Sequence, residues 1–272
     1  MRSRTVTGGG GVEIHVEERG PSDARPVLLI HGFSQSRLAW TPQFESSLVD
    51  DYRLVAMDLR GHGASGTPDD PEAYRDSVLW ADDVRAVIEG LSLDDPTLVG
   101  WSYGGLVVSD YLATHGDDAV AGSVLVDGIT EKGTADADRF AGEQFVALDS
   151  GFRSTDAEES VAALDAFVDL CVECDLDDAD RYRMLGYNVA VPPFVRAAMQ
   201  DRTVEHEAAL ADVATPVLLI HGTADPVVRP AAARKHADLF PNATLELYEG
   251  VGHSPFFEVP DRFEADLRAF LE

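Results

Sequence analysis

Short apolar runs that alternate with helical patterns constrain the fold of this chain more than any other feature. Four runs read as strands buried on both faces: residues 27–30, 54–57, 97–99 and 123–126. A more polar run, residues 12–16, alternates like a half-exposed strand. Between the second and third runs, Val84, Val87, Ile88 and Leu91 fall on one face of a helix that Ser77 is expected to cap. Buried strands separated by amphipathic helices predict an α/β fold, with a mostly parallel central sheet flanked by helices.

This alternation stops after the fourth strand pattern and resumes near residue 216. Residues 129–210 contain no strand-like apolar run, only acidic helical segments, and Pro192-Pro193 is expected to separate two helices. Strand patterns return at residues 216–220 and 244–248, and residues 263–271 read as a closing helix. We therefore expect residues 1–128 and 211–272 to form the core and residues 129–210 an inserted helical cap. The alternative is a helical decoration without a role as a lid.

The charge of the chain is abnormal for an otherwise ordinary globular composition. Across 272 residues there are 21 Lys and Arg against 49 Asp and Glu, a formal net charge of −28. Phosphate backbones and anionic membranes bind basic patches, so neither nucleic acid nor a membrane is an expected partner. Only Lys132 and Lys235 are lysines. The composition resembles that of proteins from organisms that keep molar salt in the cell, because about 1 M salt screens such self-repulsion. An acidic mesophilic protein is the alternative.

Neither a targeting signal nor a disulfide framework is expected. Residues 1–11 contain no apolar signal-peptide region, and no run reaches the roughly 18 apolar residues of a membrane span. Cys171 and Cys174 form a CxxC in the helical insertion, where they are expected to be core residues rather than a redox or metal motif. These features predict a cytoplasmic protein.

The strongest chemical signal is the sequence Gly100-Trp101-Ser102-Tyr103-Gly104. It follows a predicted strand and precedes the apolar helical run 106–108, which is the context of a G-x-S-x-G nucleophile elbow. Side chains two positions on either side of the serine would collide with neighbouring backbone, so glycine is needed there. Ser102 is therefore the candidate nucleophile, and the N–H groups at the start of the helix favour developing negative charge.

A serine nucleophile needs a base and a group that orients the base, in the chain order Ser, acid, His. Asp225 follows the strand pattern ending at residue 220, and His253 follows the one ending at residue 248. Both are therefore expected at the carboxyl edge of the sheet, where ligands bind in open α/β folds. Asp127 also ends a predicted buried strand and is the rival acid, whose alternative role is structural. A turn or cap role is the alternative for Asp225.

The segment His31-Gly32-Phe33 follows the first buried strand and is expected to form the oxyanion loop. The oxyanion hole would then consist of the backbone N–H groups of Phe33 and Tyr103. Trp101 and Phe256, with Phe33, are candidates for an apolar substrate pocket beneath the cap, and plain core packing is the equal alternative.

The remaining polar groups are expected to be structural. His62 and His221 are interpreted as turn histidines that bond to the backbone, and the acidic runs 69–70 and 175–180 as solvated faces. No HExxH and no His/Cys cluster occurs in the sequence, so neither a metal nor a cofactor is expected.

Together these motifs resemble the α/β-hydrolase superfamily over nearly the whole chain. The similarity is carried by residues 31–33, the turn Asp58-Leu59-Arg60-Gly61-His62-Gly63, the elbow, the Asp225 loop and Gly252-His253-Ser254-Pro255. Residues 32–43 and the 58–63 turn are most similar to the cofactor-free haloperoxidase, esterase and lactonase group. Haloalkane dehalogenases and epoxide hydrolases usually carry aspartate where Ser102 stands. Tyr103 replaces the methionine that often follows the serine in the group, and no proline follows Phe33.

The resemblance and the triad pattern predict a serine hydrolase that acts on a small carboxylic ester, thioester or lactone. The same triad also serves C–C bond hydrolases and acyltransferases in related enzymes. A third alternative, from a different class, is a ligand-binding protein of this fold that does not turn over its ligand.

Overall fold

The protein, described by a computed structural model that covers all residues 1–272, is built on one eight-stranded sheet. The strand order is β1-β2-β4-β3-β5-β6-β7-β8. Strands β3 to β8 are parallel to their neighbours, whereas β2 pairs antiparallel with both β1 and β4. The strands are β1 Arg2–Thr7, β2 Glu13–Arg19, β3 Pro26–Ile30, β4 Arg53–Met57, β5 Thr97–Trp101, β6 Gly122–Val126, β7 Val217–Gly222 and β8 Ala243–Tyr248. The predicted α/β class and each predicted strand are confirmed.

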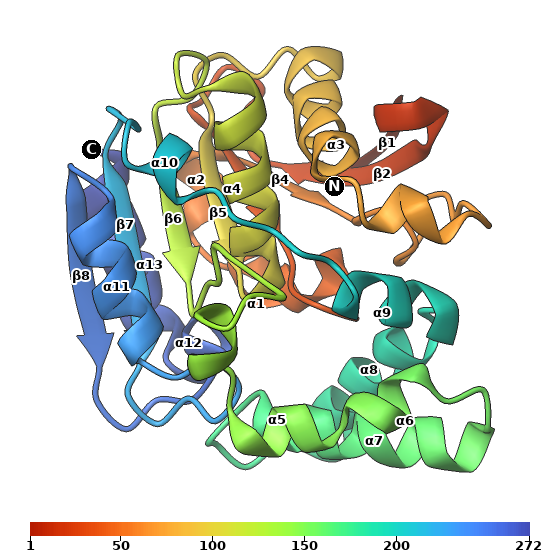
Figure 1. Ribbon diagram of the computed structural model, residues 1–272. Coiled ribbons are helices and arrows are strands. Elements are labelled where there is room, and N and C mark those ends of the chain that lie inside the picture. The colour runs from red at the N-terminus through yellow and green to blue at the C-terminus, as the bar shows by residue number, and fades with distance from the viewer.

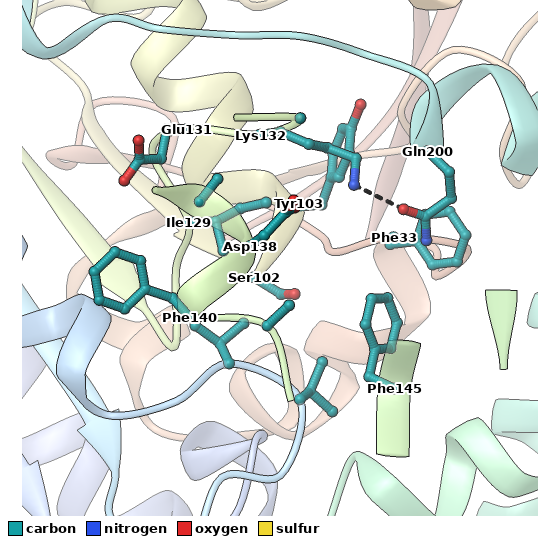
Figure 2. A pocket seen from close by; sticks show the side chains of 15 residues that line it. Phe33, Ser102, Tyr103, Ile129, Glu131, Lys132, Asp138, Phe140, Phe145 and Gln200 are labelled. Atoms are coloured by element: carbon teal, nitrogen blue, oxygen red, sulfur yellow. Dashed lines mark hydrogen bonds between the residues drawn. The ribbon is translucent and has the colours of Figure 1, made fainter. Parts of the chain in front are cut away.

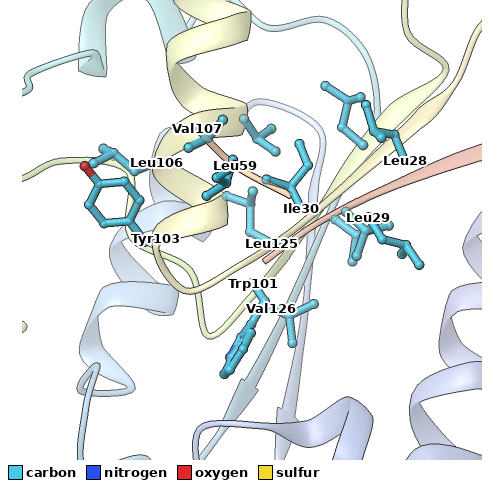
Figure 3. Close-up of a cluster of buried hydrophobic side chains, with 14 of the residues drawn as sticks. Leu28, Leu29, Ile30, Leu59, Trp101, Tyr103, Leu106, Val107, Leu125 and Val126 are labelled. Atoms are coloured by element: carbon cyan, nitrogen blue, oxygen red, sulfur yellow. The ribbon is translucent and has the colours of Figure 1, made fainter. Parts of the chain in front are cut away.

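Helices cover both faces of the sheet, with α4 and α11 in front and α2 and α13 behind in Figure 1. The helices outside the β6–β7 connection are α1 Thr41–Glu45, α2 Leu48–Asp51, α3 Ser77–Gly90, α4 Tyr103–His115, α11 Ala231–Leu239, α12 Pro255–Glu258 and α13 Pro260–Leu271. The central strands are therefore buried from both sides, and their side chains meet those of α4, such as Leu106 and Val107 (Figure 3).

Between β6 and β7 the chain forms only helices. They are α5 Glu143–Ala147, α6 Asp149–Arg153, α7 Ala157–Leu170, α8 Asp178–Val189, α9 Pro193–Gln200 and α10 Glu207–Leu210. Helices α5 to α9 form a separate layer that faces the carboxyl ends of the parallel strands (Figure 1), whereas α10 packs against α4. As predicted, Pro192-Pro193 separates two helices, α8 and α9.

Two local features differ from the sequence expectations. The cap of α3 is Asp76, whose carboxylate accepts a hydrogen bond from the N–H of Val78, and Ser77 is instead the first helical residue. The sequence shows no buried-strand pattern at the edge strand β1, because none of its side chains is buried. Its anchor is the buried carboxylate of Glu18 on β2, which pairs with Arg4 at 3.0 Å and with Arg53 of β4 at 2.7 Å.

A buried ion pair fastens the segment that returns from the helical layer to the core. Arg202 follows α9 and donates to both carboxylate oxygens of Asp110 on α4, at 2.7 and 2.8 Å. Both side chains are fully buried. The same guanidinium donates to the hydroxyl of Tyr103, the first residue of α4, at 3.1 Å. This segment is therefore held directly against the helix that begins after Ser102.

We expect Asp110→Ala to lower the free energy of unfolding by about 3–5 kcal/mol, because it leaves the Arg202 guanidinium buried without its charge partner. Chemical denaturation followed by circular dichroism measures this change. The matched control is Asp165→Ala, which removes an exposed partner of Arg181 at 2.9 Å and should cost less than about 1 kcal/mol. Equal losses in the two variants would contradict the buried-pair argument.

Candidate active site

Ser102 stands on a sharp turn between β5 and α4. Its backbone φ and ψ are 54° and −117°, a strained conformation for a residue with a side chain. The turn is possible because the glycines around it have no Cβ. A Cβ at Gly100 would clash with the carbonyl of Gly104, and one at Gly104 would clash with the carbonyl of Ile30. The sequence thus holds the Ser102 side chain at the carboxyl edge of the sheet.

Asp225 and His253 meet at the same edge of the sheet. Nδ1 of His253 lies 2.7 Å from Oδ2 of Asp225, and both side chains are fully buried. The other carboxylate oxygen, Oδ1, accepts hydrogen bonds from the N–H groups of Val227 and Val228 at 2.7 and 3.0 Å. Because the ionised acid holds Nδ1–H, the proton-accepting position of the imidazole is Nε2. That atom is buried and has no hydrogen-bond partner.

The backbone of His253 is tied to the residue that precedes Ser102. Its carbonyl accepts a hydrogen bond from Nε1 of Trp101 at 2.7 Å, and the two rings lie 5.6 Å apart between centroids. Through this contact the loop that carries His253 is fixed to the end of β5.

Asp127, which ends β6, lies in the same cluster. Oxygen atoms of Asp127 and Asp225 and a ring nitrogen of His253 all lie within 4.8 Å of one another. Oδ1 of Asp127 accepts from the N–H of Gly222 at 2.8 Å, whereas Oδ2 has no partner. Burial and the neighbouring charge of Asp225 raise the pKa of Asp127 well above its usual range. Asp127 is therefore the member of the carboxyl pair that takes up a proton more readily.

Asp225 is the ionised member of that pair. Burial alone would raise its pKa, but the imidazoles of His253 and His221 outweigh this effect and lower it. Nε2 of His221 lies 3.4 Å from Oδ2 of Asp225 and donates to the carbonyl of Val228 at 2.9 Å. The sequence indicated only a turn histidine at position 221, and its contact with the acid comes from the fold.

The loop after β3 lies against the serine. A Cβ at Gly32 would lie 3.1 Å from the Cβ of Ser102, so the two backbones are in close contact. The N–H of Phe33 has no hydrogen-bond partner, and the N–H of Tyr103 belongs to the first residue of α4, where no intrahelical acceptor exists. His31 stabilises this loop, because its Nδ1 bonds to the carbonyl of Gly32 at 2.9 Å and its Nε2 accepts from the N–H of Leu59 at 3.0 Å.

Ser102 opens into a mostly apolar cavity of about 80 Å³ (Figure 2). Residues from the core and from the helical layer line it together, among them Phe33, Tyr103, Ile129, Phe140, Phe145, Val227 and Val228. The ring of Phe33 also packs on Phe152 of α6 and Phe167 of α7, at centroid distances of 5.3 and 6.1 Å.

Trp101 and Phe256 lie outside this cavity. Their rings pack edge to face at 5.0 Å and line a separate, smaller hollow with Cys171 and Tyr187. Of the two interpretations of these rings, the structure therefore favours core packing, because the Trp101 side chain points away from the Ser102 cavity. Sequence patterns also gave no sign of two polar residues that do line the cavity, Lys132 and Gln200.

The other polar motifs have structural surroundings. The prediction that both cysteines are core residues is wrong for Cys174, which is exposed beyond the end of α7, whereas Cys171 is buried. The acidic residues 175–180 are exposed or partly exposed, and Asp177 caps α8. A second carboxylate cluster, Glu131 with Asp136 and Glu207, surrounds the ammonium of Lys235. No helix in the structure is both long enough and apolar enough to cross a membrane.

Comparison with known proteins agrees with this geometry. The sequence model of the alpha/beta hydrolase fold family matches residues 25–260, and the chain belongs to this family of hydrolases. The chain is 31% identical to a non-heme chloroperoxidase of Streptomyces lividans, over 98% of this chain and 99% of that protein. It is 30% identical to a bifunctional esterase/perhydrolase of Acinetobacter calcoaceticus, over 98% of both chains. Among solved structures, an esterase of Rhodococcus sp. ECU1013 superposes with a TM-score of 0.94 at 38% identity, covering 99% of this chain and 98% of the esterase.

Buried neutral histidines around the site predict a loss of stability in mild acid. Burial lowers the pKa of His31, His62 and His236 from 6.5 to about 3. In the unfolded chain the same groups take up protons near pH 6.5, so the unfolded state binds more protons below that pH. We expect the free energy of unfolding to be highest above pH 6.5 and to fall toward pH 5. The fall should be at most about 1.4 kcal/mol per pH unit for each histidine.

Urea denaturation at pH 7, 6 and 5 and constant ionic strength measures this fall. Carboxylates of ordinary pKa, about 4, stay mostly ionised in this range and contribute little. Asp127 and Asp83, whose pKa burial raises, oppose the fall, but they are two groups against three histidines. A free energy of unfolding that stays constant or rises toward pH 5 would contradict the prediction.

Proposed function

We propose that this hydrolase cleaves small carboxylic esters, thioesters or lactones through an acyl-enzyme, with Ser102, His253 and Asp225 as its catalytic triad. The observation that carries the proposal is the buried 2.7 Å contact between Asp225 and Nδ1 of His253, which leaves Nε2 without a partner. The strained Ser102 turn and the cavity into which Ser102 opens support the same chemistry. The esterases among the similar proteins also support this chemistry.

In the first half of the reaction, Oγ of Ser102 attacks the carbonyl carbon of the substrate. Nε2 of His253 takes the hydroxyl proton, while Asp225 stays ionised and stabilises the imidazolium. The carbonyl oxygen becomes an oxyanion held by the N–H groups of Phe33 and Tyr103, with the positive end of α4 beside it. Loss of one such donor typically costs about 2.7–4 kcal/mol of transition-state stabilisation. Collapse of the intermediate expels the alcohol, thiol or lactone oxygen, which takes the proton from His253.

In the second half, His253 removes a proton from water as its oxygen attacks the acyl carbon on Ser102. The oxyanion forms again in the same hole, and its collapse returns the proton to Oγ and releases the carboxylic acid. We assign to residues 129–210 the role of a cap, because Phe140, Phe145 and Gln200 from this region line the cavity around Ser102. The cap would set which acyl and alcohol groups fit.

Labelling with a fluorophosphonate probe tests the activated serine. We expect the wild-type protein to be labelled and Ser102→Ala to remain unlabelled, because the probe reacts only with an activated hydroxyl. Labelling in about 2–3 M KCl should exceed labelling at low salt if screening of the net charge of −28 stabilises the fold.

The outcomes of this experiment separate the two arguments. Labelling that is independent of salt would support the proposed hydrolase activity and contradict the expectation that high salt stabilises the fold. Folded wild-type protein that takes up no probe would overturn the proposed catalysis in favour of a ligand-binding protein without turnover.

The assignment of the acid is tested by two matched asparagine variants. Asp225→Asn should lower kcat by up to about 10⁴-fold, because an amide at this position holds the wrong tautomer of His253. Asp127→Asn should keep most of the activity, since the amide oxygen can still accept from the N–H of Gly222 and asparagine tolerates the φ of 45° at this position. Steady-state ester hydrolysis measures both, and a larger loss in Asp127→Asn would make Asp127 the acid.

A further inference from the structure

Lys132 is the only cationic residue that lines the cavity around Ser102. Its ammonium donates a hydrogen bond to Oε1 of Gln200 at 2.7 Å, and no carboxylate lies within 4.0 Å of it. The only other lysine, Lys235, has three carboxylate partners: Glu131, Asp136 and Glu207. In a chain with 49 acidic residues, a lysine without one of them as a partner requires an explanation.

The neighbouring charges are already paired with other groups. Glu131, the acidic residue next to Lys132, is bound to Lys235, and Asp138 at the cavity edge is exposed. Arg202 is paired with Asp110, and Arg153 with Asp149 and Asp201. Arg196 on α9 also has no ion pair, but its guanidinium is held by backbone carbonyls and by Oγ of Ser160 and does not line the cavity. Lys132 is therefore the one cation in the cavity lining, and no direct ion pair balances its charge.

The electrostatic surroundings make Lys132 receptive to an anion. Burial lowers its pKa to about 8, and the more distant carboxylates of Asp149 and Asp138 only partly oppose this effect, while Arg153 and Arg202 add to it. A desolvated ammonium with a neutral amide as its partner gains more from an incoming carboxylate than an exposed lysine would.

Contacts within residues 129–210 fix the position of the ammonium. The backbone of Lys132 exchanges two hydrogen bonds with Val204, at 3.1 and 2.8 Å, and Gln200 is the last residue of α9. In Figure 2, Lys132 and Gln200 lie above Ser102, and Phe145 lies lower, to the right of Ser102. The cavity thus offers apolar walls and one cationic group. Its lining also contains two acidic residues: Glu131, which is bound to Lys235, and the exposed Asp138.

We propose that the preferred substrates of this cavity are esters that carry a carboxylate, which binds to the ammonium of Lys132 while the ester carbonyl lies at Ser102. This inference rests on the proposed esterase function and deepens it by naming a substrate class. The carboxylate belongs to the acyl part or to the alcohol part of the ester. Both present the same group to Lys132, and the experiment distinguishes them.

Two matched substrate pairs test the proposal. Monoethyl adipate and ethyl hexanoate differ only by a carboxylate in place of the terminal methyl of the acyl chain. The 4-acetoxybutanoate anion and butyl acetate differ in the same way on the alcohol side. In the wild-type enzyme, kcat/KM measured by titration of released acid should be higher for the charged member of at least one pair.

Lys132→Met should lower the preferred charged-to-neutral ratio of kcat/KM by about 10- to 100-fold, the range for one hydrogen bond to a charged group. The ratio is compared rather than the absolute rate, because Lys132 lines the cavity, and circular dichroism reports whether the variant is folded. Lys132→Arg keeps the positive charge and should restore part of the ratio. Arg85→Met, at an exposed position on α3, changes the net charge equally and should leave the ratio unaltered.

The outcomes separate failure of this inference from failure of the proposed function. If the wild type hydrolyses neutral esters but prefers neither charged ester, the inference is overturned and the esterase stands. The inference is also overturned, and the esterase stands, if Lys132→Met keeps the preference for the charged ester, or if Arg85→Met lowers that preference as much as Lys132→Met does. If Lys132→Met loses activity on all four esters, its charged-to-neutral ratio cannot be measured, and the ratios of the wild type and of Lys132→Arg decide instead. A wild-type preference for a charged ester that Lys132→Arg keeps in part supports the inference, and a wild type without such a preference overturns it. Folded wild-type protein that hydrolyses none of the four esters overturns both.

Discussion

The close approach of backbone to backbone at the end of β5 is the constraint on which the rest of the site depends. Gly104 in the first turn of α4 packs directly against the carbonyl of Ile30 at the end of β3, with no room for a Cβ. This contact brings the start of α4 and the loop after β3 next to each other beside Ser102. The strain at Ser102 and the two free N–H groups near it are consequences of the same contact, because α4 can begin there only if the chain turns sharply.

The second determinant is electrostatic. Two carboxyls are buried next to one imidazole, and two neighbouring buried carboxyls do not both ionise readily. The fold resolves this by placing His253 and two backbone N–H groups around Asp225, whereas Asp127 receives a single backbone N–H. His221 lies near both, 3.4 Å from Asp225 and 3.6 Å from Asp127. The pKa of Asp225 is therefore lowered, so that it stays ionised and holds the imidazole, and the pKa of Asp127 is raised. This division follows from which groups surround each carboxyl, not from the residue type.

Charge is distributed differently in the interior and on the surface. The interior uses arginine in closely paired sites, such as Arg60 with Asp83 and Arg202 with Asp110, where all four side chains are fully buried. The surface carries the large acidic excess that gives the chain its net charge of −28. Salt screens exposed charges far more than buried pairs, so ionic strength acts on the surface and leaves the interior pairs intact. Lys132 belongs to neither group, since it is partly buried and has no acidic partner.

The sequence by itself determined the strand order along the chain, the elbow at Ser102 and the position of the helical insertion. Apolar runs, glycines and prolines act through local sterics and burial, which a linear pattern records. It did not reveal β1, whose exposed strand is anchored by the distant Glu18, or the exposure of Cys174. Only the tertiary structure decided that Asp225 and not Asp127 contacts His253, that His221 supports the acid, and that Lys132 reaches the cavity without a carboxylate. These depend on contacts that form only in the folded chain, such as that between Asp225 and His253, 28 residues apart. Pairing and desolvation, which set the state of each charge, exist only once the chain has folded.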